Sequence, residues 1–413
     1  MSAVSHQSTA DKLKEERFRY ANLGPVIFGL LLATGVGALI MIVSLFVPWD
    51  HEAHAGARQF LVSWLFAFMF FFTIAAGSLF WILIHYTMDA EWSAVIKRLL
   101  ETATNSFSLL PFLFIPMAVG APLLYQWMTI SAGVEPSLDN KRILLNPKAW
   151  AIFTVVYFSF FFTASYTLRW LSLKQDNTND MGYSTKARGW CFAFVPFFGV
   201  FLTFAAIHWV MSISYHWYST MWGVYVFAGS AWSSMAMLII VTYLLRRAGY
   251  LEGVVSTQHF HIMGKLLLSF TVFWAYIAFS QFFLIWYANI PEETEFFVVR
   301  NTESWNTWAM VMQVFGHFFV TFALLLRRGA KTSPKFLMGV AIWVLVMHAA
   351  DWYIIVNPFV HEKGIRPVTM IVDLAALVTI GCPLVLLFLR TLGRHPLVAR
   401  HDARLPESLR LTN

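Results

Sequence analysis

The sequence predicts an all-α integral membrane protein, and three observations lead to this fold class. The chain has 413 residues, of which 58% are hydrophobic and only 12% are charged, whereas soluble domains carry about 25% charged residues. Ten apolar segments are long enough to cross a hydrocarbon core of roughly 30 Å as helices. Lys and Arg are distributed very unequally between the two sets of connecting segments. Runs such as LLLATGVGALIMIV lack the alternation of a membrane β-barrel, so helices are expected.

The ten predicted spans follow one another with short connections. A helix satisfies its own backbone hydrogen bonds, which lipid cannot do. The spans are placed at residues 24–47, 59–85, 104–128, 149–168, 190–214, 219–245, 266–290, 305–326, 336–357 and 367–389. We therefore expect one ten-helix membrane domain over 24–390, with an N-terminal tail of residues 1–23 and a C-terminal tail of residues 391–413.

The positions of Lys and Arg predict which side of the membrane each connection occupies. Of the 29 Lys and Arg residues, 22 lie in segments on the side of the N-terminus and 7 on the opposite side. Because cytoplasmic loops carry the excess of Lys and Arg, both termini of this multi-pass membrane protein are expected in the cytoplasm. The polar first 23 residues and the full-length first apolar run predict no cleavable signal peptide. The net charge of +7 then faces anionic lipid, and it gives no support for nucleic-acid binding.

Two carboxylates lie well inside predicted spans, Asp351 in the ninth and Asp373 in the tenth. On insertion scales each costs on the order of 2.5–3.5 kcal/mol near a helix centre. We expect no Lys, Arg or Glu clear of the span ends. An ionisable residue in a membrane helix is by default a functional hypothesis, so both aspartates are candidate site residues.

Three histidines are also placed inside spans: His208 in the fifth, His317 in the eighth and His348 in the ninth. His348 and Asp351 are three residues apart, so they share one helix face. Gln313 and His317 are four apart and share a face in the same way. For each single histidine, the alternative role is a structural hydrogen bond.

A further group of polar residues is expected near the outer ends of the spans. The topology places HWVMSISYHWYSTMWGVY (208–225) and FSQFFLIWYANIPEE (279–293) on that side. If these helices are neighbours, their polar side chains would converge near the outer face, as a set comprising His208, Tyr215, His216, Tyr225, Gln281, Asp351 and Asp373. The alternatives are an interfacial aromatic belt for the tyrosines and a structural interhelical hydrogen bond for Gln281.

Such residues suit two kinds of chemistry. A quinol has two hydroxyl protons and a flat ring, so its site needs hydrogen-bonding His, Asp or Tyr groups among apolar walls. The same groups could instead form a proton relay across the bilayer. The sequence assigns no catalytic residue and no metal ligands, and it contains no nucleotide, flavin or phosphate-loop motif. Its two cysteines are too few for an iron–sulfur cluster, which takes about four thiolates.

Two other classes of protein remain open. A cytochrome b-type anchor subunit needs histidines from facing helices; His208 and His216 are eight residues apart and the other in-span histidines are single, which disfavours two haems but leaves one haem open. An ion or small-solute transporter is the second class, because such folds often contain Gly/Pro-broken helices in both halves. The segment SLLPFLFIPMAVGAP (108–122) is broken in this way, but no matching partner is evident.

Three segments carry a resemblance to a known family. HWVMSISYHWYSTMWGVY, FSQFFLIWYANIPEET and HAADWYIIVNP resemble the F subunits (ActF) of alternative complex III, which belong to the NrfD-like, polysulfide-reductase-type membrane subunits. The resemblance covers essentially the whole chain. It implies two four-helix bundles, formed by spans 2–5 and 6–9, with the first and tenth helices at their flanks.

The resemblance also implies a function. Alternative complex III is a bacterial quinol:electron-acceptor oxidoreductase of respiratory or photosynthetic electron transport. Its partners for this chain would be a sister NrfD-like subunit, an iron–sulfur subunit and c-type cytochrome subunits, together with membrane lipid. His348 and Asp351 match the family's intramembrane His-x-x-Asp, and His208 matches its fifth-helix motif, as candidates for a proton path. No covalently bound cofactor is implied, and contact with a quinone such as menaquinone is left open, since the family's quinol site lies in the sister subunit.

Overall fold

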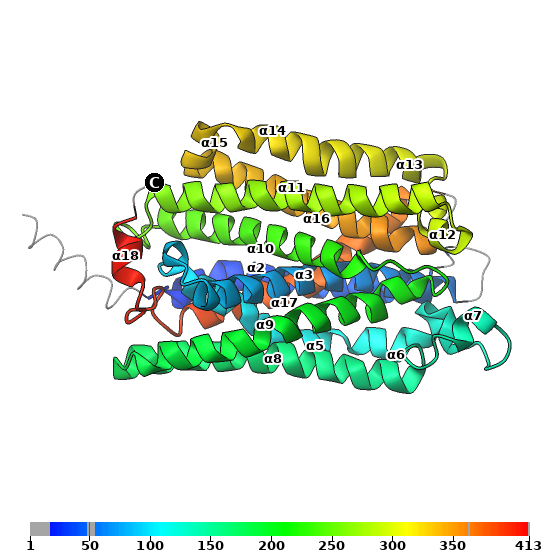
Figure 1. The fold of residues 1–413 in the computed structure, drawn as a ribbon, viewed down its shortest axis with the longest axis horizontal. Coiled ribbons are helices and arrows are strands. Elements are labelled where there is room, and N and C mark those ends of the chain that lie inside the picture. The colour runs from blue at the N-terminus through cyan, green and yellow to red at the C-terminus, as the bar shows by residue number, and fades with distance from the viewer. Residues whose placement is uncertain (1–16, 48, 50–53, 362–363, 412–413) are drawn as a thin grey trace, which may run out of the picture.

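The computed structural model describes residues 17–47, 49, 54–361 and 364–411, and within these ranges all regular secondary structure is helical (Figure 1). Nine helices of the described part are long and apolar enough to cross a bilayer. A further pair, Lys97–Ser108 and Leu110–Leu124, is bent by 44° and makes a tenth if it counts as one span. The chain is therefore an all-α, multi-pass membrane protein. Most of the predicted N-terminal tail, residues 1–16, lies outside the described residues.

The long helices lie side by side along the long axis of the molecule, and short helices close the two ends (Figure 1). In the described part of the chain, eight spans are single helices: α2 (Gly24–Ser44), α3 (Ala55–Thr87), α8 (Pro147–Thr178), α9 (Gly182–Trp209), α10 (Trp222–Arg247), α11 (Thr257–Ala288), α16 (Pro334–Val356) and α17 (Pro367–Leu392). The bent third span consists of α4 (Lys97–Ala103), η3 (Thr104–Ser108), α5 (Leu110–Leu113) and α6 (Ile115–Leu124). The eighth span consists of α13 (Glu303–Ala309), η6 (Met310–Val320) and α14 (Thr321–Leu326). The end helices are α7 (Pro136–Asp139), α12 (Pro291–Val299), α15 (Arg328–Thr332) and α18 (Leu405–Leu409).

We name the two ends of the molecule after these short helices. The α18 end also contains α15, and the α12 end also contains α7 (Figure 1). The first described residues reach the α18 end too, because the ring of Phe18 packs on that of Tyr250 with centroids 5.6 Å apart. The described part of the chain therefore has its first and last residues at the same end of the bundle.

Two helices, α3 and α10, form the centre of the molecule. In each of them 72% of the most apolar window is buried, against 11% for α2 at the periphery. Around α3 pack α6, α9 and, through α9, α8, whereas α11 and α16 pack around α10. The α2 and α17 helices pack on each other, and α17 also lies along α3. Since lipid is the solvent, the outer faces are lined by exposed apolar side chains such as Phe28 and Leu32.

Small residues allow α3 and α10 to approach closely. A Cβ atom at Gly77 of α3 would collide with the backbone oxygen of Ser230 and with Oγ of Ser234 on α10. Small residues are typical of such contacts between membrane helices, because van der Waals packing drives their association. The crossing at Gly77 therefore fixes the distance between the two central helices.

We expect Gly77→Val to lower the free energy of unfolding by about 1–3 kcal/mol, because an overpacked interior forces backbones apart. The measurement is loss of helical circular dichroism with temperature in detergent. Gly199→Val on α9 is the matched control, since a Cβ atom there meets nothing within 4 Å. Equal loss of stability in the two variants would contradict a close α3–α10 contact.

Candidate functional site

Asp351 is the centre of a buried polar cluster to which three helices contribute. Its side chain is 3% exposed. The hydroxyl of Tyr225 on α10 donates a hydrogen bond of 2.5 Å to Oδ1, and Nε2 of Gln313 on η6 donates one of 2.8 Å to the same oxygen. Burial of a carboxyl group without such partners is very unfavourable. Three helices thus meet at one carboxyl group, which ties the site to the packing of the core.

Gln313 reaches Asp351 from an unusual stretch of backbone. Residues 310–320 form a π-helix. This conformation is rare in proteins, and where it occurs it is often found at a functional site. The indole of Trp343 on α16 donates a hydrogen bond of 3.0 Å to the carbonyl of Gly316, and Oγ1 of Thr321 donates one of 3.1 Å to the same oxygen. These donors help to accommodate the widened turn. The apolar pattern of the span did not predict this conformation.

His348 lies one turn before Asp351 and contacts a different helix. Its Nε2 atom is 2.9 Å from Oγ1 of Thr73 on α3 and accepts a 3.3 Å hydrogen bond from the indole of Trp352. Because an indole nitrogen only donates, a neutral His348 ring carries its proton on Nδ1. That buried Nδ1 has no hydrogen-bond partner among the described residues. A Cβ atom on Gly229 would lie 3.6 Å from it, so the glycine leaves room beside this nitrogen.

His317 is enclosed by two indole rings. Its ring stacks between Trp274 and Trp232, with centroids 3.4 and 3.9 Å away. Both of its nitrogens are buried, and neither has a hydrogen-bond partner in the part of the chain that the structure describes. The ring is therefore held by its two faces rather than by its nitrogens.

Asp373 ends a hydrogen-bonded chain that begins near the α12 end. Nε2 of His361 lies 2.6 Å from Oε1 of Gln59, within hydrogen-bond distance. Nε2 of Gln59 donates a hydrogen bond of 2.9 Å to Oγ of Ser63, and Oγ of Ser63 donates one of 2.6 Å to Oδ1 of Asp373. All four side chains are buried. Sequence reasoning found Asp373 but missed the other three; the spacing of four between Gln59 and Ser63 on α3 was the available signal.

The remaining predicted site residues do not join Asp351. His208 pairs with the hydroxyl of Tyr157 on α8 at 2.7 Å from its Nδ1 atom. Gln281 accepts a hydrogen bond of 3.2 Å from Ser219. Of the set expected to converge near the outer face, Tyr225 alone contacts Asp351 among the described residues. Within the described residues, His208 and Gln281 have other partners, and the second donor to Asp351 is Gln313, which lies outside the predicted set.

Tyr215 and His216 form a separate polar group at the α12 end. The hydroxyl of Tyr215 donates 2.6 Å to Glu135, and Nε2 of His216 lies 3.2 Å from the same carboxylate. Burial, followed by the hydrogen bond to Glu135, raises the pKa of Tyr215 to about 12. A cavity of about 260 Å³ lies beside them and is also lined by Arg58 and Glu295.

The α18 end contains a buried ionic cluster that the sequence did not predict. Asp402, from the segment expected to be a C-terminal tail, accepts a hydrogen bond from Lys97 and lies 3.2 Å from Nε2 of His85. Nδ1 of His85 is 2.7 Å from Oγ of Ser93, and Lys97 also donates 3.0 Å to the hydroxyl of Tyr86. Burial alone would raise the pKa of Asp402, but Lys97 and His85 hold it well below its usual value.

A second ion pair lies beside this cluster. Arg98 donates to Asp176 on α8, and its guanidinium is 3.1 Å from Glu101. Arg98 and Glu101 are fully buried, like Lys97. These three residues lie in the first turns of the third span, which begins near Lys97 rather than at the predicted residue 104. Opposite charges on α8 and in the C-terminal segment make this burial tolerable.

The fold and the site define the chain as a helical, multi-pass membrane protein with ionisable groups in its interior. No group of three or more His, Cys, Asp or Glu side chains within the described residues could hold a metal ion. No protein-family model matches the chain, and no curated protein matches it. The arrangement of these polar groups therefore carries the functional argument.

We expect Asp402→Asn to lower the free energy of unfolding by about 3–5 kcal/mol at neutral pH, because it leaves buried Lys97 without its counter-charge. The pKa of Asp402 is depressed in the folded protein. Its stabilising effect is therefore complete above the unfolded-state pKa of about 3.9 and is lost only as the pH falls below that value. Thermal unfolding in detergent from pH 3 to 8 checks this.

The control for this prediction is Asp180→Asn. Asp180 is exposed and accepts a hydrogen bond from the backbone N–H of Gly182. The side-chain oxygen of Asn can accept the same hydrogen bond. We expect no loss of stability in that variant. A similar loss of stability in both variants would contradict the assigned ion pair. So would a difference in unfolding free energy between the wild type and Asp402→Asn that already decreases at neutral pH.

Proposed function

We propose that this chain is a proton-conducting membrane subunit of an alternative complex III-type quinol:electron-acceptor oxidoreductase. The observation that carries proton conduction is the carboxyl group of Asp351, which is buried in the core and held by two hydrogen-bond donors from separate helices. The placement in that complex is supported by the three segments that resemble the F-type subunits. Electron carriers belong to its proposed partners: the iron–sulfur subunit, the c-type cytochrome subunits and the sister NrfD-like subunit.

Helix α3 supports this proposal because it contributes to polar clusters at three depths. Gln59 and Ser63 belong to the chain that ends at Asp373, Thr73 lies beside His348, and His85 belongs to the ionic cluster at the α18 end. From residue 59 to residue 85 a helix rises about 39 Å at about 1.5 Å per residue. That exceeds a hydrocarbon thickness of roughly 30 Å. Protonatable groups thus occur at both ends and in the middle of a membrane crossing.

We also propose ten spans, with both termini on the cytoplasmic side of a bacterial inner membrane. The excess of Lys and Arg on the N-terminal side supports this orientation, which makes the α18 end cytoplasmic. The helices from α3 to α9 and from α10 to α16 would form the two four-helix bundles that the resemblance implies. The contact between α2 and α17 fits their place as flanking helices.

A second role, contact with a quinone headgroup, is favoured by one observation. The cavity of about 260 Å³ at the α12 end is lined by Tyr215 and His216, which offer hydrogen-bonding groups to a ring oxygen. A photoreactive menaquinone analogue would test it in the purified complex. Labelling of peptides around Tyr215 that excess menaquinone prevents supports the role, and labelling confined to other subunits contradicts it.

We expect Asp351→Asn to reduce proton movement coupled to quinol oxidation by at least about tenfold, the effect of about 1.4 kcal/mol on a barrier. An amide at this position keeps the shape but does not take up and release a proton. The measurement is acidification reported by a pH-sensitive dye in liposomes that contain the purified complex. Asp180→Asn is the control, and it should behave as the wild type. Unchanged proton movement in an assembled Asp351→Asn complex would overturn the proposal.

Ser63→Ala tests the path that leads to Asp373. Loss of the hydroxyl interrupts the chain of hydrogen bonds between Gln59 and Asp373. If this raises the activation free energy for proton transfer by about 1.4 kcal/mol, the rate of proton movement should fall by about tenfold. Ser63→Thr retains a hydroxyl and serves as the matched control. If alanine and threonine give the same rate as serine, this chain is not part of the path.

The other two classes left open by the sequence lead to different measurements. A haem-bearing subunit would show a visible absorption spectrum that changes on reduction, in preparations of this chain free of cytochrome subunits. A solute transporter would move a labelled ion or metabolite into liposomes that contain the chain alone. Either result would replace the proposed role.

A further inference from the structure

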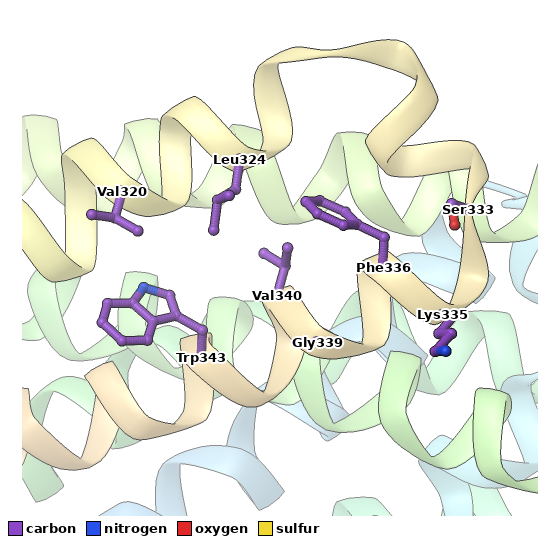
Figure 2. Close-up of a pocket in the computed structure, with 8 residues that line it drawn as sticks. All are labelled: Val320, Leu324, Ser333, Lys335, Phe336, Gly339, Val340 and Trp343. Atoms are coloured by element: carbon purple, nitrogen blue, oxygen red, sulfur yellow. The ribbon is translucent and has the colours of Figure 1, made fainter.

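A groove of about 520 Å³ opens on the surface between two helical spans (Figure 2). Val320 and Leu324 line one wall, and Phe336, Val340 and Trp343 line the other. Ser333 and Lys335 lie at the end of the groove where α15 leads into α16 (Figure 2). Phe336 is 45% exposed and Val320 is 40% exposed, so the groove faces the membrane and not the protein core.

Cations gather near the Lys335 end of this groove without carboxylates from the same helices. Residues 253–291 and 304–350 supply α11, the run from η6 to α15, and most of α16, and neither segment contains Asp or Glu. They do contain Lys and Arg at this end of the molecule, namely Lys265, Arg327, Arg328, Lys331 and Lys335. The groove therefore has apolar walls along its length and positive charge at one end.

Lys331 shows how closely these charges lie. Its ammonium group donates to the backbone carbonyls of Leu325 and Leu326, and so it closes the turn after α14. Burial, followed by the charge of Lys265, lowers its pKa. A negative group from outside these helices would relieve this repulsion.

We propose that the groove binds an anionic phospholipid, with an acyl chain along the apolar walls and the phosphate held by Lys335 and its neighbouring cations. The chemistry of the two ends of the groove matches the two ends of such a lipid. Basic pockets on the cytoplasmic side of membrane proteins bind anionic headgroups in this way. The inference needs only that the chain spans a membrane, and it stands or falls independently of proton conduction.

The bound chain would contact the side chain that supports the π-helix. Trp343 lines the groove, and its indole donates to the carbonyl of Gly316 within η6. Gln313, a donor to Asp351, belongs to the same π-helix. Lipid in the groove would therefore stabilise the helix that presents Gln313 to the interior.

Native mass spectrometry of the full chain in detergent tests the proposal, with phosphatidylglycerol and phosphatidylcholine of identical acyl chains as probes. We expect tighter binding of phosphatidylglycerol, and a loss of about fivefold for each cation removed in Lys335→Gln and in Lys335→Gln with Arg327→Gln. Gly339→Leu should weaken both lipids, because a Cβ atom at Gly339 meets nothing within 4 Å and the added side chain enters the groove.

Two variants on α9 provide matched controls. Lys186→Gln removes an exposed cation near the start of that helix, and Gly199→Leu adds the same bulk at a glycine that also has open space. Both should bind phosphatidylglycerol as the wild type does. Equal affinity of the wild type for the two lipids, or equal losses in the control and groove variants, would overturn the proposal.

Competition separates a lipid from other occupants. Inorganic phosphate and glycerol phosphate should not displace phosphatidylglycerol at equal concentration, because they lack the acyl chain. Displacement by either would show a site for free phosphate and would overturn the lipid assignment. Displacement by menaquinone at equal concentration would overturn it as well, since the groove would then be a quinone site.

Discussion

The interior of this protein depends on one constraint: a polar group in a membrane must find its partners within the protein, because lipid offers none. Asp351 meets this constraint through Tyr225 and Gln313, which come from α10 and η6. The backbone of η6 adopts a π-helix where it presents Gln313. The buried carboxyl group of Asp351 thus links α16 to α10 and to the π-helix η6.

The same constraint accounts for the C-terminal segment. Lys97 and Arg98 are buried at the start of the bent third span, where water does not reach their charges. Asp402 and Asp176 provide the opposite charges from distant parts of the chain. A segment with the composition of a solvated tail therefore folds against the α18 end, because its carboxylate has a partner there.

Polar clusters and lipid contact are linked through the π-helix. Gln313 faces the interior from this segment, and the carbonyl of Gly316 accepts from Trp343 in the lipid-facing groove. Under the two proposals made above, a lipid on one side of η6 would support a protonatable site on the other. The π-helix would then be the physical connection between the membrane and the interior.

The sequence by itself determined the class of fold and which candidate site residues share a helix face. Long apolar runs require helices in lipid, and the spacing of three between His348 and Asp351 places both on one face. Tertiary structure alone decided the partners: Tyr225 for Asp351, Ser63 for Asp373, and Tyr157 for His208. The physical reason is range. Hydrophobicity and spacing act within one helix, whereas a partner depends on how separate helices rotate and pack against one another.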